Sequence, residues 1–245
     1  AFGSSGEKDK DKWILFDWIN NSNIDSIPFK DISAFIFEPG SSSGLVRFPP
    51  KNLIKKIIDN IRENDGIVIT EEVTTGIGRT GEWFGFNHYD FSPDIIAMGK
   101  GLGNGYPVSC VVLSKSILNK LDLNTFHYGQ SHQNDPLGAA IANEVISIIE
   151  EEALINSCKE KGERIISFLN EIKDKYGIIK EIRGRGLMIA VEFKKNEKFS
   201  YAEKINYELL KRNIILVKRP GLEVFRIDPS LTITNEEIDY FLDNF

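Results

Sequence analysis

Two carboxylates and one amine stand at the ends of two short apolar runs. The first run, residues 67–69, leads into Glu71 and Glu72, and the second, residues 95–98, leads into Lys100 between two glycines. Open α/β sheets build ligand sites from buried strands that end in charged residues beside glycine turns. An amine and a carboxylate brought to one sheet edge suit carbonyl–amine chemistry.

The sequence around these residues resembles a family signature. EEVTTGIGRTG (71–81), followed by PDIIAMGKGLGNGYP (93–107), is similar to the signature of the class III pyridoxal-phosphate-dependent aminotransferases. The resemblance implies that Lys100 forms the Schiff base with pyridoxal 5′-phosphate and then moves a proton between substrate and cofactor. It also implies that Glu71 stands beside the pyridine nitrogen and that Val73 packs on the ring.

Glu71 and Thr74 depart from the family pattern. Glu71 replaces the usual aspartate, keeping the charge that holds the ring nitrogen protonated but adding one methylene. Thr74 stands where many members carry a glutamine near the phenolic oxygen of the cofactor. Because side chains alternate along a strand, Glu71 and Glu72 point to opposite sides, and the alignment favours Glu71 as the ring partner. A solvent-facing carboxylate at a strand end is the alternative for Glu71.

Three further positions are assigned by the resemblance. The segment AFIFEPGSSSGLVRFPP (34–50) resembles the EPxxGxxG stretch that borders the substrate pocket, and Ser43 replaces a glutamate found in ornithine-type members. That absence resembles the ω-amino-acid–pyruvate branch, although a plain flexible loop has the same composition. Arg226, in FRIDPSLTIT, aligns with the arginine that contacts a substrate carboxylate or that glutamate. Ser131 aligns with a threonine that reaches the cofactor phosphate of the partner subunit.

The periodicity of the chain predicts alternating helices and strands. Expected strands cover residues 34–37, 67–69, 95–98, 108–113, 214–217 and 224–227; expected helices cover residues 50–64, 137–152, 153–176, 200–211 and 235–244. Asp135 is expected to cap one helix at its start, and Gly177 another at its end. The resemblance implies an α/β protein of fold type I. We expect residues 1–150 to form the second part of a large, mostly parallel-sheet, cofactor-binding domain, and residues 151–245 a small α+β carboxyl-terminal domain.

The composition restricts the partners. The net charge of −6 and the pI near 5.3 argue against nucleic acid, and no apolar run approaches the ~20 residues that span a bilayer. His127 and His132 lack metal-ligand spacing, so no metal site is expected. Cys110 and Cys158 lie far apart without a CxxC pattern, which indicates reduced, buried thiols in a cytoplasmic protein.

The family's amino-terminal portion, with its phosphate-binding loop and ring-stacking aromatic, has no counterpart in these residues. We therefore expect a carboxyl-terminal part of an aminotransferase, inactive alone, whose complete form is a homodimer with a site shared between subunits. The expected reaction passes an amino group from an amino donor, such as an ω-amino acid or amine, to a 2-oxo acid such as pyruvate. Two alternatives stay open: a catalytically silent dimerisation module, and a racemase or aminomutase with the same cofactor motif.

Overall fold

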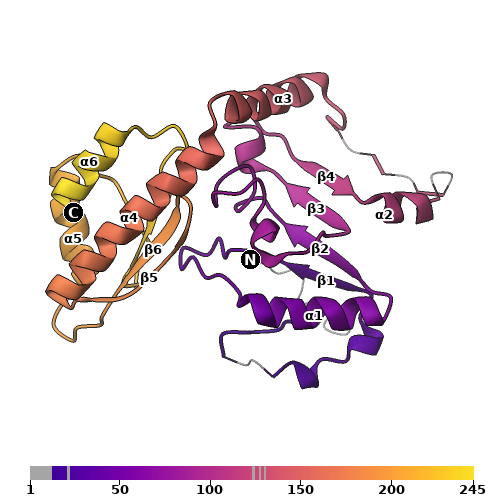
Figure 1. Cartoon of the computed structure of the whole chain (residues 1–245), viewed down its shortest axis with the longest axis horizontal. Helices are drawn as coiled ribbons and strands as arrows, with labels where there is room; N and C mark the ends of the chain where they lie inside the picture. Colours follow the sequence, from indigo (N-terminus) through magenta and orange to yellow (C-terminus); the bar gives the residue numbers. More distant parts are fainter. Residues whose placement is uncertain (1–12, 21–22, 123–124, 127, 130) are drawn as a thin grey trace.

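Two sheets, each with its own helices, make up the fold (Figure 1). The computed structural model describes residues 13–20, 23–122, 125–126, 128–129 and 131–245. His127 and residues 1–12 therefore lie outside the described part. The first sheet has the order β1-β2-β3-β4 and the second the order β5-β6-β8-β7.

The first sheet is mostly parallel, as the sequence predicts. β1 (Ala34–Phe37), β2 (Ile67–Glu71) and β3 (Ile95–Met98) run in the same direction, so their carboxyl ends meet at one edge. The last strand, β4 (Cys110–Leu113), is antiparallel to β3 and forms the outer edge. The strand expected over residues 108–113 is two residues too long, since its first two residues do not pair.

Helix α1 (Lys51–Glu63) covers part of this sheet. Its isoleucines recur at helical spacing and all four are buried, packing against Phe37, Val68 and Tyr89: Ile54, Ile57, Ile58 and Ile61. The helix starts after Pro50, whose extended backbone places it outside the helix as the N-cap. Our expected helix over 50–64 was therefore one residue too long at each end.

Three helices follow β4 along the chain. The short α2 (Lys115–Lys120) leads toward α3 (Pro136–Glu151), which Asp135 caps by accepting a hydrogen bond from the Leu137 N–H. The long α4 (Leu154–Tyr176) ends at Gly177, whose backbone is left-handed, φ +65°. Both predicted caps are confirmed.

The second sheet is antiparallel and packs against α4. It contains β5 (Ile179–Arg185), β6 (Met188–Phe193), β7 (Val217–Lys218) and β8 (Val224–Ile227). α5 (Tyr201–Lys211), capped by Ser200, and α6 (Asn235–Asn244) complete this lobe. The strand expected over residues 214–217 is in the wrong place: the observed strand β7 contains only Val217 and Lys218, which pair with β8.

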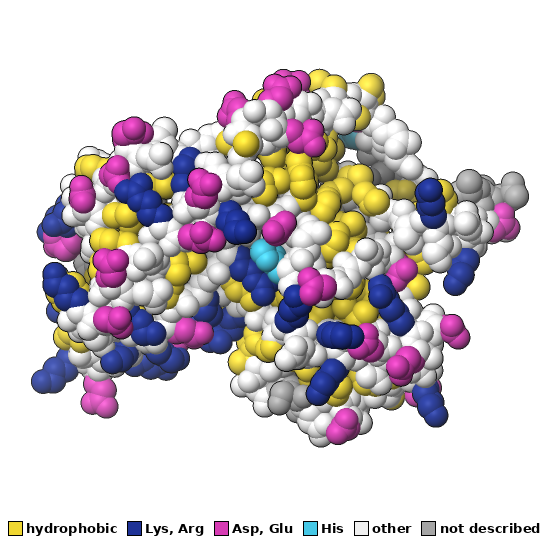
Figure 2. Space-filling model, viewed as in Figure 1, with side chains coloured by type: hydrophobic (Ala, Val, Ile, Leu, Met, Phe, Trp, Pro, Cys, Tyr) yellow, Lys and Arg dark blue, Asp and Glu magenta, His cyan; other side chains and the backbone are white. Residues whose placement is uncertain are grey.

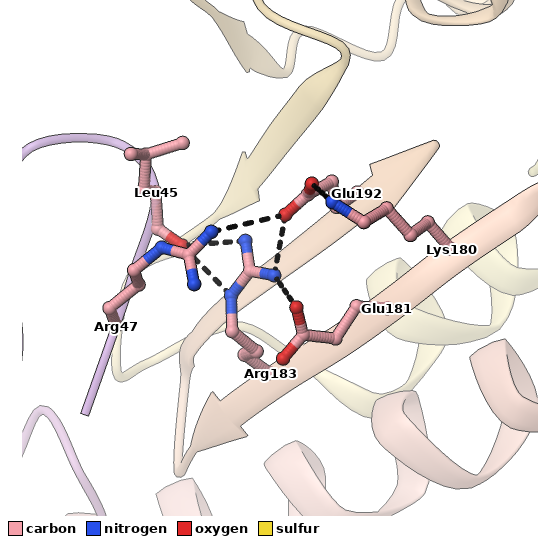
Figure 3. A network of polar contacts seen from close by, with 6 residues as sticks. All are labelled: Leu45, Arg47, Lys180, Glu181, Arg183 and Glu192. Atoms are coloured by element: carbon pink, nitrogen blue, oxygen red, sulfur yellow. Dashed lines mark hydrogen bonds and ion pairs between the residues drawn. The ribbon is translucent and has the colours of Figure 1, made fainter. Parts of the chain in front are cut away.

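Segment 41–48 of the first lobe packs on the second sheet, where Val46 is fully buried with Met188, Ala190 and Val224. Arg183 of β5 donates two hydrogen bonds to the Leu45 carbonyl, at 2.9 and 3.1 Å, and pairs with Glu192 at 2.7 Å (Figure 3). Segment 41–48, which belongs to the part of the chain expected to form the large domain (residues 1–150), thus also packs on the second sheet.

No helix in the described ranges is long and apolar enough to cross a membrane.

Candidate active site

The carboxyl ends of β1, β2 and β3 bring together an amine and two carboxylates. Glu38 follows β1, Glu71 ends β2, and Lys100 follows β3 after one glycine. The Lys100 amine donates a hydrogen bond of 2.7 Å to Thr74 Oγ1. The predicted placement of Lys100, Glu71 and Thr74 at one sheet edge agrees with this arrangement.

Lys100 has an unusual backbone. Its φ is +42°, in the left-handed region, where a side chain costs on the order of 1 kcal/mol. It begins a short 3₁₀ turn, Lys100–Leu102, which the buried Leu102 fixes to the core beneath α3. Strain of this kind persists where the surroundings fix the backbone, and it is concentrated at functional positions.

Glu71 is half-buried and held in place by its own chain. Its Oε1 accepts a hydrogen bond of 2.7 Å from the Val73 N–H. Burial is the main reason that the pKa of the Glu71 carboxyl lies above its usual range. The Val73 N–H opposes this rise, the charge of Glu38 and a hydrogen bond with it add to it, and the charge of Lys100 opposes it.

Glu72 has a different role. Its carboxylate is completely buried and accepts hydrogen bonds from Thr75 Oγ1 at 2.6 Å and from the N–H groups of Gly85 and Phe86, each at 2.9 Å. Burial raises the pKa of Glu72, and these three donors lower it. Glu72 therefore ties the loop after β2 to residues 85–86, and only Glu71 of the two lies beside Lys100.

Val73 and Thr74 line the space between the ends of β2 and β3. The Val73 methyls lie 3.7 and 3.8 Å from the point where a Cβ on Gly99 would stand, so Val73 reaches across to the end of β3. Thr74 is buried, and its hydroxyl oxygen accepts the hydrogen bond from the Lys100 amine. These two side chains give the edge an apolar surface and a hydroxyl next to the amine.

Arg226 of β8 is connected to the same sheet edge by hydrogen bonds that pass through Ser42, in segment 41–48. Its guanidinium pairs with Asp228 at 2.6 Å and donates to the Ser42 carbonyl at 3.3 Å. The Ser42 N–H donates to Glu38 Oε1 at 3.1 Å. The backbone of one residue, Ser42, thus connects Arg226 with Glu38.

Ser131 stands apart from this cluster. It is exposed in the turn ahead of α3, and no hydrogen bond connects it to another described residue. His132 is exposed in the same turn, and the described part of the chain contains no group of acidic, histidine and cysteine side chains arranged for a metal ion. An open cavity of about 460 Å³ lies on α5 and β7 in the other lobe and includes none of these residues.

Sequence reasoning missed Glu38 as a member of the site. Glu38 was placed only within the stretch that borders the substrate pocket, without a contact to Glu71, and Ser42 and Asp228 had no role. The sequence signal that could have identified this contact was the length of the two strands. Because β1 and β2 pair in parallel up to Phe37 and Thr70, the residues that follow, Glu38 and Glu71, lie beside each other.

The residues at this edge fit the ring end of pyridoxal 5′-phosphate. Its aldehyde needs an amine, which Lys100 supplies; its pyridine nitrogen needs an anion, which Glu71 supplies; and its ring needs an apolar contact, which Val73 supplies.

Comparison with known proteins places these observations in a family. The family model described as aminotransferase class III matches residues 16–245. The chain is 34% identical over 225 residues to the alanine–glyoxylate aminotransferase 2 of Pongo abelii, covering 88% of this chain and 43% of that protein. It is 34% identical over 212 residues to an ornithine aminotransferase of Geobacillus, covering 86% of this chain and 51% of that protein.

The fold has solved counterparts. The ornithine aminotransferase of Toxoplasma gondii superposes with a TM-score of 0.84 at 29% identity, over 94% of this chain and 54% of that one. The chain spans about half the length of the curated relatives it matches.

Proposed function

Since this chain belongs to the class III aminotransferases, which depend on pyridoxal 5′-phosphate, we propose that its complete protein transfers an amino group from an amino donor to a 2-oxo acid. The observation that carries the proposal is the Lys100 amine, 2.7 Å from Thr74 Oγ1 and beside Glu71 at the edge where three parallel strands end. The bound cofactor would supply an electron sink for the carbanion formed at the substrate Cα.

Lys100 is the proposed catalytic residue. Its amine would hold the cofactor aldehyde and, once free, would serve as the base that moves the proton from the substrate Cα. The exposed Lys100 side chain has room for this movement, while its backbone stays fixed by the turn that Leu102 anchors.

Glu71 is the proposed partner of the pyridine nitrogen. A carboxylate at hydrogen-bond distance holds a proton on that nitrogen and so maintains the electron demand of the ring. The extra methylene compared with aspartate is accommodated because the Val73 N–H holds one carboxylate oxygen close to the strand end. Val73 is the proposed ring contact, and Thr74 the hydroxyl near the phenolic oxygen.

Arg226 is the proposed binding residue for a substrate carboxylate. Asp228 now pairs with it, so a bound carboxylate must compete with that ion pair or add to it. Ser43 leaves no acidic side chain at the position that ornithine-type relatives use to neutralise this arginine. An ω-amino acid or amine as donor and pyruvate as acceptor therefore fit the proposal.

The complete protein is proposed to be a cytoplasmic homodimer. Large apolar side chains are exposed on β4, α2 and α3 and in the segment between these two helices: Val111, Val112, Leu118, Phe126, Tyr128 and Leu137. Figure 2 shows hydrophobic side chains gathered below α3. Exposed apolar side chains that gather on one face mark association surfaces. Ser131 is exposed within the same stretch, in keeping with a role at the partner's cofactor phosphate. Cys158 is buried as expected, whereas Cys110 is exposed, and both free thiols fit a reducing compartment.

A half-reaction of the complete protein tests this function. The protein loaded with pyridoxal 5′-phosphate is mixed with a panel of amino donors, including β-alanine and ornithine, and the cofactor spectrum is followed while the oxo product is identified. We expect conversion of the cofactor to its amine form and its return on addition of pyruvate. A product of unchanged composition but altered stereochemistry or amino position would indicate a racemase or aminomutase, and no spectral change with any donor would indicate a silent module.

A further inference from the structure

Glu38 and Glu71 are neighbours across two parallel strands. The pairing of β1 with β2 places Phe37 beside Thr70, so the next residues along, Glu38 and Glu71, stand side by side where both strands end. Register partners on adjacent strands extend their side chains toward the same face of a sheet. Two carboxylates therefore meet on the face of the edge where Lys100 lies.

Backbone donors prevent these carboxylates from moving apart freely. The Ser42 N–H binds Glu38 Oε1 at 3.1 Å, and the Val73 N–H binds Glu71 Oε1 at 2.7 Å. Two adjacent carboxylates in a half-buried position repel each other when both are ionised, and this repulsion favours a proton on one of them. The raised pKa of Glu71, to which both burial and Glu38 contribute, agrees with this geometry.

The other charged groups around Glu71 are few. Lys100, from the end of β3, faces the pair, and its charge acts on Glu71. Glu72, next along the same strand, turns away and is enclosed by its three donors. Among the described residues, Glu38 is thus the carboxylate that shares the environment of Glu71.

We propose, resting on the function proposed above, that Glu38 is a positioning residue that keeps one proton on the Glu38–Glu71 pair until the cofactor binds. The proton then passes from the pair to the pyridine nitrogen: a carboxyl O–H bond breaks, an N–H bond forms, and no proton is drawn from solvent. The cation so formed lies against two carboxylates and relieves their repulsion. The site can in this way bind the unprotonated pyridine and protonate it in place.

The titration of Glu71 in the cofactor-free protein is the first test. Complete protein labelled with ¹³C at the glutamate carboxyls is titrated by NMR, and the Glu71 resonance is assigned from Glu71→Gln. We expect Glu38→Gln to move the Glu71 midpoint down toward its ordinary value, and Glu38→Asp to retain part of the upward shift. Glu63→Gln removes the same charge at the end of α1, ahead of the amino end of β2, and should leave the midpoint unchanged. An equal Glu71 midpoint in the parent and in Glu38→Gln would overturn the inference.

Proton uptake during cofactor binding is the second test. Calorimetric titration with pyridoxal 5′-phosphate, repeated in two buffers of different ionisation enthalpy, counts the protons exchanged. At a pH above the ordinary pKa values of carboxyl groups, the Glu38→Gln variant should take up more protons from the buffer during cofactor binding than the parent does. The difference should be at most about one proton per site. Proton exchange at Lys100 is common to both proteins and cancels. Equal uptake would overturn the inference.

The two proposals fail separately. If borohydride does not fix the cofactor to Lys100, the proposed function fails, and with it the cofactor part of this inference. If the cofactor is fixed to Lys100 while Glu38→Gln changes neither the Glu71 midpoint nor the proton uptake, the function stands and this inference alone is overturned.

Discussion

The amine of Lys100 donates a hydrogen bond of 2.7 Å to Thr74 Oγ1, although 26 residues separate the two along the chain. The contact exists because β2 and β3 are parallel neighbours, so the residues that follow each strand lie at the same edge. It positions the amine of a side chain that is itself exposed.

Lys100→Ala should abolish covalent fixation of the cofactor. In the complete protein, borohydride reduction followed by peptide mass analysis should find the label on Lys100 alone, because its amine is the one held at the strand ends beside Glu71. Lys115→Ala, at the exposed start of α2, serves as the control and should label as the parent does. Undiminished labelling of Lys100→Ala would disprove the assignment.

Glu71→Gln should lower kcat far more than cofactor affinity. Glutamine keeps the acceptor for the Val73 N–H but loses the charge that holds the ring proton, and this charge matters most as the carbanion forms. Glu71→Asp, which restores the commoner family residue, should keep activity or raise it. Half-transamination rates of the complete protein give the comparison; a parent-like rate for Glu71→Gln makes Glu71 a bystander.

Glu72→Gln should affect stability instead. A buried carboxylate with three donors is replaced by an amide that cannot accept from all of them, so at least one N–H or O–H loses its partner at a cost of about 1–3 kcal/mol. Urea unfolding should register this loss. A selective fall in kcat with unchanged stability would instead exchange the roles of the two glutamates.

The pH dependence of stability should differ between the cofactor-free chain and its Glu71→Gln variant. Because the folded pKa of Glu71 is raised, the native state binds more protons than the unfolded state between the two pKa values, and the free energy of unfolding falls as pH rises through that window. Glu71→Gln removes this loss and should raise Tm relative to the parent at neutral pH, with the gain disappearing below the unfolded pKa. A gain that persists unchanged into acid would show that Glu71 ionisation is not its cause.

Arg183→Met should destabilise the fold by about 1–3 kcal/mol, since it leaves the Leu45 carbonyl without its two guanidinium donors and Glu192 Oε2 without its nearest donor, while Lys180 still pairs with Glu192 Oε1. Only 8% of the Arg183 side chain and 13% of that of Glu192 are exposed, so water cannot replace the contacts. The double variant Arg183→Met with Glu192→Leu should recover part of the loss. Chemical denaturation measures both; equal stability of parent and single variant would contradict the arrangement in Figure 3.

Gly162→Ala should destabilise the chain by about 1–3 kcal/mol, because a Cβ there would lie 2.1 Å from the Gly186 carbonyl oxygen and α4 would have to move from β5. Glu163→Ala, exposed at the next position of the same helix, is the matched control and should stay near parental stability. Thermal unfolding of the three proteins separates these outcomes.

Local sequence patterns predicted most of the helices and strands, but the direction in which strands pair was harder to predict. Strands at 34–37 and 224–227 came out as expected, because β-branched and aromatic residues form short runs bounded by turn residues. The antiparallel direction of β4 was not foreseen, since an isolated apolar run carries no information on strand direction.

The same limit applies to the site. The placement of Lys100, Glu71 and Thr74 at one sheet edge could be predicted because two neighbouring motif segments, 71–81 and 93–107, contain them all. The contact of Arg226 with Ser42 spans 184 residues, and that of Arg183 with Leu45 spans 138, so neither could be read from local sequence. Glu38 falls between these cases: its strand was predicted, but its neighbour depends on a register that sequence periodicity does not determine.

β4 has consequences for handling this chain as an isolated polypeptide. It pairs with β3 alone among the described residues, and Val111 and Val112, from its opposite faces, are 63% and 42% exposed. An unpaired edge with apolar faces is a template on which any extended, partly unfolded chain can add as a further strand. The yield of refolded protein should therefore fall steeply as protein concentration rises, because aggregation, measured as turbidity, competes with refolding. Val111→Lys should reduce this aggregation while leaving the sheet intact.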